Sequence, residues 1–228
     1  MVSISILVEC AAVVTAIVHG FGGRESLGVA LSIGYAICAV GVWIGVDNFL
    51  MKRGVAPDQI WGWRDEQPSS EQREPWIRRY LVADDGAWRW LSLGLVGGAL
   101  LGVLAHGYML VVQLIPSVSE TIRTRQHLLR SNPGLITAYA VAAIGFAPFA
   151  EEFLFRGMLY RTLDRHMGGW KPVGAAAAFF AIYHPALSWL PVAVVGAANC
   201  LLFKRSKRLA PAVLLHMAYN SVVLLLTL

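Results

Sequence analysis

The stretch Phe149-Ala150-Glu151-Glu152-Phe153-Leu154-Phe155-Arg156 decides the fold of this chain, because it places two adjacent carboxylates at the end of an apolar run, 138–150. An ionised carboxylate near the centre of a bilayer costs about 2.5–3.5 kcal/mol on insertion scales, so such side chains face the protein interior and find partners there. Two later apolar segments each supply a histidine that could be such a partner, His184 and His216. We therefore expect three membrane segments to meet at these side chains.

The composition predicts an integral membrane protein. Of the 228 residues, 57% are hydrophobic and 14% are charged, whereas ordinary soluble domains have about 25% charged residues. A membrane helix needs ~20 apolar residues, so an all-α, polytopic protein with one transmembrane domain over 1–228 and six to eight spans fits the length. The net charge of +5 does not indicate nucleic-acid binding, because Lys and Arg lie in short loops between apolar runs. Cys10, Cys38 and Cys200 lie inside apolar runs and are expected to be buried packing residues without disulfides.

The apolar runs divide the chain into segments. We expect spans at about 3–20, 27–50, 88–115, 134–152 with a kink at Pro148, and 210–228, and two shorter apolar runs at 172–184 and 185–203. The first run has no basic residues before it and contains Glu9, which favours a retained span over a cleaved signal peptide. The polar, tryptophan-flanked segment 51–87 predicts an interfacial or cytoplasmic loop, and 116–133 has the composition of a short amphipathic helix. One face of the third span, formed by Gly94, Gly97, Gly98 and Gly102, is expected to allow close helix packing.

The basic residues predict an orientation. The loops 51–88, 161–171 and 204–208 fall on one side and hold most of the Lys and Arg, while Arg24 and the connection 123–130 fall on the other. Because cytoplasmic loops carry an excess of positive charge, the first group and the N-terminus are expected to lie in the cytoplasm. The abundance of Ala, Gly, Val and Arg suits a bacterial GC-rich genome, and hence a bacterial inner or plasma membrane.

Spacing on helices brings the polar side chains into pairs. Glu152 and Arg156 are i and i+4, hence neighbours on one helix face, and the arginine would keep that carboxylate ionised. Glu151 points about 100° away, so one carboxylate can be anchored while the other takes a proton. His216 and Asn220 have the same spacing and would present an imidazole and an amide to one point. A carboxylate, two histidines and an amide suffice for hydrolysis: a base for water, and donors for the developing oxyanion.

Three motifs together resemble the CAAX-protease and bacteriocin-processing (CPBP, or Abi) family of intramembrane proteases. The family pattern Glu-Glu-x-x-x-Arg, Phe-x-x-x-His and His-x-x-x-Asn stands here as Glu151-Glu152-Phe153-Leu154-Phe155-Arg156, Phe180-Ala181-Ile182-Tyr183-His184 and His216-Met217-Ala218-Tyr219-Asn220. The resemblance covers residues from about 136 onward. It implies a bundle of about seven to eight transmembrane helices around a central polar, water-accessible cavity, and a membrane-associated protein or peptide as substrate.

The resemblance also implies a role for each site residue. Glu151 would be the general base on the attacking water, assisted by His184, and His216 and Asn220 would form the oxyanion hole. Glu152 and Arg156 would hold the constellation in place. No cofactor is favoured, but zinc held by Glu151, His184 and His216 is a second mechanism, because three N/O ligands and a water form a valid catalytic zinc set.

Two alternatives stay open from the residues alone. A transporter or a non-catalytic membrane binding protein could also place charges inside the membrane, although no internal repeat typical of transporters is visible. The remaining polar residues of the apolar runs are interpreted as satisfying one another or lying at interfaces, namely Glu9, His19, Asp47 and Asn199.

Overall fold

In the described part of the chain all regular secondary structure is helical. The computed structural model describes residues 87–131 and 133–228, together with positions 37, 41, 44, 45, 48, 49 and 51–54. In 87–228 the elements follow in the order α5 (Ala87–Val112), α6 (Pro116–Arg130), α7 (Pro133–Ala140), η1 (Val141–Phe146), α8 (Ala147–Glu152), η2 (Phe153–Tyr160), α9 (Arg161–His166), α10 (Lys171–Ile182), η3 (Ala186–Ser188), α11 (Trp189–Ser206) and α12 (Leu209–Thr227). The expected spans at 3–20 and 27–50 and the loop 51–87 lie outside the described residues, apart from the isolated positions just named.

Three helical stretches in this part are long and apolar enough to cross a membrane. They are Trp88–Val112 with 25 residues, Ala186–Ser206 with 21 and Leu209–Thr227 with 19. At 1.5 Å per residue these stretches are roughly 28–38 Å long, which matches a hydrocarbon core of about 30 Å. The expected spans at 88–115 and 210–228 are therefore confirmed, and the run 185–203 proves long enough to be a span.

Glycines let α5 pack closely against α12, its main partner. A Cβ atom at Gly94 or Gly98 would overlap a backbone carbonyl oxygen of α12, from Pro211 and Leu215 respectively. At Gly102 a Cβ atom would lie 2.8 Å from the Val222 Cβ atom, whereas at Gly97 the nearest atom would be 3.8 Å away. The glycine face expected from the sequence is thus in contact with α12, with Gly97 at its edge.

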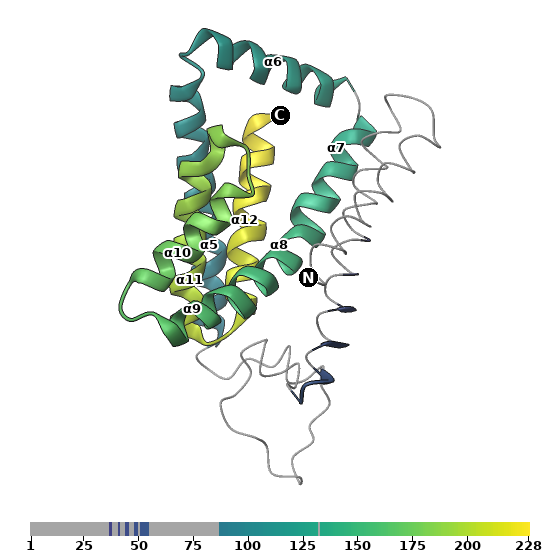
Figure 1. The fold of residues 1–228 in the computed structure, drawn as a ribbon. Helices are drawn as coiled ribbons and strands as arrows, with labels where there is room; N and C mark the ends of the chain where they lie inside the picture. Colours follow the sequence, from purple (N-terminus) through teal and green to yellow (C-terminus); the bar gives the residue numbers. More distant parts are fainter. Residues whose placement is uncertain are drawn as a thin grey trace.

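The segment that carries the Glu-Glu pair is one helical path with two wide, π-helical stretches, η1 and η2. Figure 1 shows that this path, from α7 to α9, runs obliquely past α12. The first π-helical stretch ends next to Pro148, which is buried in the first turn of α8. A proline inside a helix removes a backbone hydrogen bond and crowds the carbonyl four residues earlier, so the irregularity expected at Pro148 takes the form of a π-helical stretch.

Helices α10 and α11 form an antiparallel pair that starts and ends at one end of the molecule. The 12 residues of α10 span only about 18 Å, so this helix is too short to cross the membrane by itself. The turn from α11 to α12 is tight: Lys207 has a left-handed backbone with φ of 56°. Cys200 of α11 is fully buried and free, in agreement with its expected role as a packing residue.

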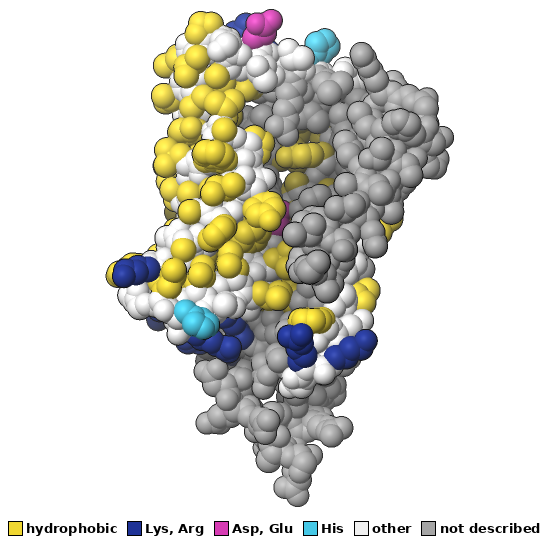
Figure 2. Space-filling model, viewed as in Figure 1, with side chains coloured by type: hydrophobic (Ala, Val, Ile, Leu, Met, Phe, Trp, Pro, Cys, Tyr) yellow, Lys and Arg dark blue, Asp and Glu magenta, His cyan; other side chains and the backbone are white. Residues whose placement is uncertain are grey.

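The two ends of the described part differ in character. Lys and Arg side chains gather at the end with α9 and the α11–α12 turn (Figure 2), where the Lys204 Nζ atom lies 3.3 Å from an Asp164 carboxylate oxygen. The loops 161–171 and 204–208 therefore share one end, as the charge count predicts. At the opposite end α6 lies across the bundle (Figure 1) and confirms the expected short helix in 116–133; Gln126 Nε2 donates to the Thr227 carbonyl at 2.9 Å.

Candidate active site

One carboxylate oxygen forms the centre of the polar network. Glu152 Oε1 lies 2.9 Å from Arg156 Nη1, 2.8 Å from Asn199 Nδ2 and 2.9 Å from His216 Nδ1. The arginine follows on the same helical path, whereas the asparagine comes from α11 and the histidine from α12. The side chains of Glu152 and Arg156 are both 0% exposed. Glu152 is thus enclosed and accepts three hydrogen bonds through Oε1, whereas its Oε2 is buried without a hydrogen-bond partner in the described part of the chain.

Arg156 is held on three sides. Besides its ion pair with Glu152, its Nη2 donates to the Gly196 carbonyl at 3.0 Å, and its Cζ atom lies 4.4 Å from the centre of the Phe180 ring. A Cβ atom at Gly196 would come within 3.1 Å of the Ala177 Cα atom and 3.2 Å of Phe180. The glycine thus lets α10 and α11 approach, which brings its carbonyl to the guanidinium. A buried charge needs such partners, since an unpaired one is strongly unfavourable.

Asn199 is part of this network, and its interpretation as an interfacial or mutually satisfied polar residue is wrong. The side chain is 0% exposed and donates to Glu152 at 2.8 Å. It lies in the middle of an apolar helix, where a polar residue is by default a candidate for a functional site. That signal was present in the sequence, but no spacing rule connects Asn199 to a glutamate 47 residues earlier in the chain.

His216 connects the two glutamates. Arg156 and Asn199 nitrogens can only donate, so Glu152 Oε1 is an acceptor and His216 Nδ1, which faces it at 2.9 Å, carries the hydrogen. In the neutral ring Nε2 is then the acceptor, and this atom lies 3.8 Å from Glu151 Oε2. The Glu151 side chain is 19% exposed, in contrast to its fully enclosed neighbour. Of the two carboxylate side chains, Glu151 is the one with exposed surface, although its Oε2 atom is itself buried.

The second histidine, His184, contacts the same Phe180 ring as His216. His184 is half-buried just after α10, and its Nδ1 lies 3.0 Å from the Phe180 carbonyl. A carbonyl only accepts, so Nδ1 carries the hydrogen and Nε2 is the acceptor in the neutral ring. The Phe180 ring contacts both imidazoles, with centroid distances of 4.9 Å to His184 and 5.6 Å to His216. Phe180 thus packs against both imidazoles of the network. Trp189 Nε1 donates to the His184 carbonyl at 2.8 Å and fixes the backbone there.

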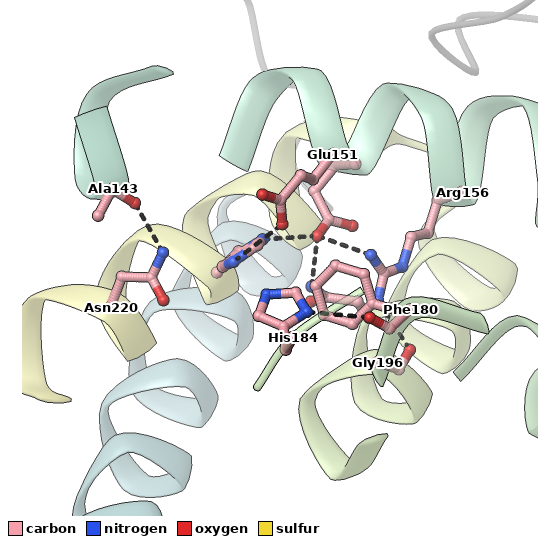
Figure 3. A network of polar contacts seen from close by, with 10 residues as sticks. Ala143, Glu151, Arg156, Phe180, His184, Gly196 and Asn220 are labelled. Atoms are coloured by element: carbon pink, nitrogen blue, oxygen red, sulfur yellow. Dashed lines mark hydrogen bonds and ion pairs between the residues drawn. The ribbon is translucent and has the colours of Figure 1, made fainter. Parts of the chain in front are cut away.

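Asn220 has a different partner from His216, although the two share a helix face. Its Nδ2 donates to the Ala143 carbonyl at 2.6 Å; Figure 3 shows this pair on the opposite side of the network from Arg156 and Gly196, with His184 between. In a π-helix each N–H bonds the carbonyl five residues earlier, and Ala147 bonds Ala142 in this way. The carbonyl of Ala143 would next receive the N–H of residue 148, a proline that has none. Asn220 supplies the missing donor.

The proposed zinc ligands do not form a ready metal site. Within the described residues, no group of three or more His, Cys, Asp or Glu side chains is arranged so that it could hold a metal ion. His216 Nδ1 and His184 Nδ1 are both bonded to protein oxygens. Metal-ligating histidines usually donate their other ring N–H to a carboxylate or carbonyl in this way, so these bonds leave Nε2 of each ring for a ligand and the zinc alternative stays a prediction.

Comparison with known proteins shows what this part of the chain is similar to. Residues 133–222 match the family model described as type II CAAX prenyl endopeptidase Rce1-like. This range contains all three motifs and every side chain of the network described above. The match makes residues 133–222 similar to a family of peptidases, and the three apolar helices indicate an integral membrane protein. More particularly, the match confirms over residues 133–222 the resemblance to the CPBP family.

One curated relative extends this comparison. The chain is 27% identical over 142 residues to the UPF0177 protein YbdI of Lactococcus lactis subsp. lactis (strain IL1403), an alignment that covers 60% of this chain and 74% of the relative. No solved structure gives a significant match.

Proposed function

We propose that this protein is an intramembrane endopeptidase that hydrolyses a peptide bond of a membrane-associated protein or peptide, with residues 136–228 as the catalytic core. The observation that carries the proposal is the contrast between the two adjacent glutamates. Glu152 is enclosed and accepts three hydrogen bonds on one oxygen, while Glu151 is partly exposed and has the His216 Nε2 atom 3.8 Å from its Oε2. One carboxylate is thus fixed and the other is accessible for proton transfer.

In the proposed reaction Glu151 accepts a proton from water as the water oxygen attacks the scissile carbonyl carbon. His184 helps to hold the water through Nε2, because its Nδ1 is bonded to the Phe180 carbonyl. The negative charge that develops on the carbonyl oxygen is stabilised by Asn220 and His216. The amide of Asn220 has a second hydrogen besides the one given to Ala143, and His216 donates from Nε2 when its ring carries both protons. Breakdown of the tetrahedral intermediate returns the proton from Glu151 to the leaving amine.

The membrane arrangement is part of the proposal. His216 lies about 10 Å along α12 from Leu209, within the thickness of the hydrocarbon core. We place the basic end of the bundle, with loops 161–171 and 204–208, and the N-terminus in the cytoplasm of a bacterial cell. A bundle of seven to eight spans around a polar cavity, including the spans expected before residue 87, would give water access to Glu151.

The test is cleavage of a peptide library by the purified full chain in detergent. Wild type is compared with Glu151→Gln and with Glu120→Gln, a control that makes the same chemical change at an exposed position of α6. We expect Glu151→Gln to lose turnover by a factor of ~10²–10⁴ and the control to keep it. Retained activity in Glu151→Gln, or no turnover by folded wild type, would contradict the proposal. A zinc chelator should leave wild-type activity unchanged; activity lost to the chelator and restored by zinc would favour the metal alternative.

A further inference from the structure

We propose that Asn199 is a positioning residue of this site, which acts on the reaction through Glu152 and His216. The inference rests on the proposed function, since it assigns a role in the same reaction. No motif includes this residue. It is one of the fully buried side chains of the described part and the only amide among the three donors on Glu152 Oε1.

Helix α11 provides one hydrogen-bond acceptor and one donor to the buried ion pair of Glu152 and Arg156. The Gly196 carbonyl accepts from Arg156 at 3.0 Å, and three residues later Asn199 donates to Glu152 at 2.8 Å. Residues three apart lie on the same face of a helix. Because Glu152 and Arg156 lie on one helical path, their mutual ion pair cannot fix them relative to the rest of the bundle. The two contacts from α11 fix the pair against a second helix.

The orientation of the amide is determined by its neighbours. A carboxylate accepts and an amide nitrogen donates, so Nδ2 faces Glu152. Asn199 Oδ1 is buried and has no hydrogen-bond partner in the described part of the chain. The side chain thus makes a single polar contact, and that contact is with the carboxylate that orients His216.

The consequence for catalysis lies in the ring of His216. Since Glu152 Oε1 already accepts from Arg156 and Asn199, it can only accept from His216 Nδ1, which leaves Nε2 directed to Glu151. The other charged or titratable groups close to Glu152 are Arg156, Glu151 and Cys200. Loss of the Asn199 donor would leave Glu152 with one fewer contact and allow the carboxylate to rotate. His216 would then lose its fixed orientation toward Glu151.

The kinetic test uses Asn199→Leu, which removes the donor at similar size, and Val195→Ala, a packing control at a buried position of the same helix. We expect Asn199→Leu to lower kcat by on the order of tenfold or more with KM unchanged, and Val195→Ala to leave kcat within about twofold. In a Glu152→Gln background, Asn199→Leu should lower kcat no further, because the two residues act as a unit. A wild-type kcat in folded Asn199→Leu, or additive losses, would overturn the proposal.

A second measurement does not depend on activity. In protein with ¹⁵N-labelled histidine, the His216 signals are assigned by their absence in His216→Gln, and their shifts report which nitrogen carries the hydrogen. We expect one form with hydrogen on Nδ1 in wild type and a mixture in Asn199→Leu; identical spectra would overturn the proposal. If Asn199→Leu does not fold, Asn199→Ala is compared in the same way. If wild type cleaves no peptide, the proposed reaction fails while the ring measurement still decides the role of Asn199.

Discussion

The two glutamates at the centre of the chain have opposite surroundings although they are adjacent in sequence. We call the fully enclosed group the buried half, formed by Glu152, Arg156, Gly196 and Asn199, and the partly exposed group the open half, formed by Glu151, His184 and Asn220. In the buried half three donors converge on Glu152 Oε1, while Glu152 Oε2, Arg156 Nε and Asn199 Oδ1 are buried without a hydrogen-bond partner in the described part of the chain. In the open half His184 Nδ1 and Asn220 Nδ2 each contact a backbone carbonyl, and Glu151 Oε2 lies 3.8 Å from His216 Nε2. His216 joins the halves, with Nδ1 on Glu152 and Nε2 toward Glu151. The comparison shows how one dipeptide supplies one fully enclosed carboxylate and one with exposed side-chain surface.

The largest expected effect comes from removing the centre of the buried half. Glu152→Leu leaves Arg156 charged and unpaired in the interior, a change that typically costs 3–5 kcal/mol. We expect the variant to unfold at a much lower temperature or to fail to accumulate in the membrane. Thermal unfolding in detergent, followed by intrinsic fluorescence, measures this. Glu151→Gln is the matched variant of the open half and should change the free energy of unfolding by no more than about 0.5 kcal/mol; equal destabilisation by both would remove the distinction.

A second prediction separates two roles of Asn220 in the open half. We expect Asn220→Ala to lower kcat by on the order of a hundredfold, the usual cost of losing an oxyanion donor. The variant also removes the donor to the Ala143 carbonyl. Pro148→Ala restores a backbone N–H at residue 148, which can take over that bond. Peptide cleavage by Asn220→Ala, Pro148→Ala and the double variant is compared with wild type. The kcat of the double variant should stay low; recovery to the Pro148→Ala value would mean that Asn220 only supports the π-helical stretch.

A third prediction concerns the close packing of α5 against α12, the helix that carries His216 and Asn220. Gly98→Ala would push a methyl group against the Leu215 carbonyl, next to His216. Overpacking of this kind costs about 1–3 kcal/mol. Gly97→Ala, one position earlier, meets only ordinary contact at 3.8 Å and should be neutral or stabilising by up to about 1 kcal/mol, because alanine is the better helix former. Melting temperatures of the two variants test this; the same effect in both would show that α5 does not hold α12 through close contact.

The smallest effect is expected at the turn that joins the helix of Asn199 to the helix of His216. Lys207 has φ of 56°, a conformation that costs a residue with a Cβ atom about 1–2 kcal/mol relative to glycine. Lys207→Gly should raise the melting temperature by the equivalent of up to about 1 kcal/mol, because the greater freedom of glycine in the unfolded chain offsets part of the gain. The kcat should not change. A lower melting temperature would indicate that the Lys207 side chain contributes more to stability than its left-handed backbone conformation costs.

Much of the described fold could be predicted because a helix needs ~20 apolar residues to cross the hydrocarbon core of a membrane. The runs 88–115 and 210–228 correspond to the observed Trp88–Val112 and Leu209–Thr227, and the glycine spacing in the first of them identified the face that meets α12. The ion pair of Glu152 with Arg156 followed from i, i+4 spacing alone. These features depend on local periodicity, which a sequence records directly.

The rest depends on register and on contacts between distant segments. Asn220 was expected to meet His216 at one point, but the π-helical stretch before Pro148 exposes a carbonyl that binds it instead. A π-helix has no sequence period of its own that would reveal this. Asn199 was set aside because nothing near it in the sequence marks a partner, whereas its actual partner lies on another helix. The catalytic roles of these residues stay a prediction.

The convergence of three donors on Glu152 Oε1 also has a consequence for assembly. Inside a bilayer the lipid tails are as apolar as leucine, so apolar side chains alone give helices little reason to associate. A single oxygen that binds groups from η2, α11 and α12 would let these segments recognise one another after insertion. Glu152 would then determine which helices pair with one another. In a water-soluble protein the hydrophobic core has this role.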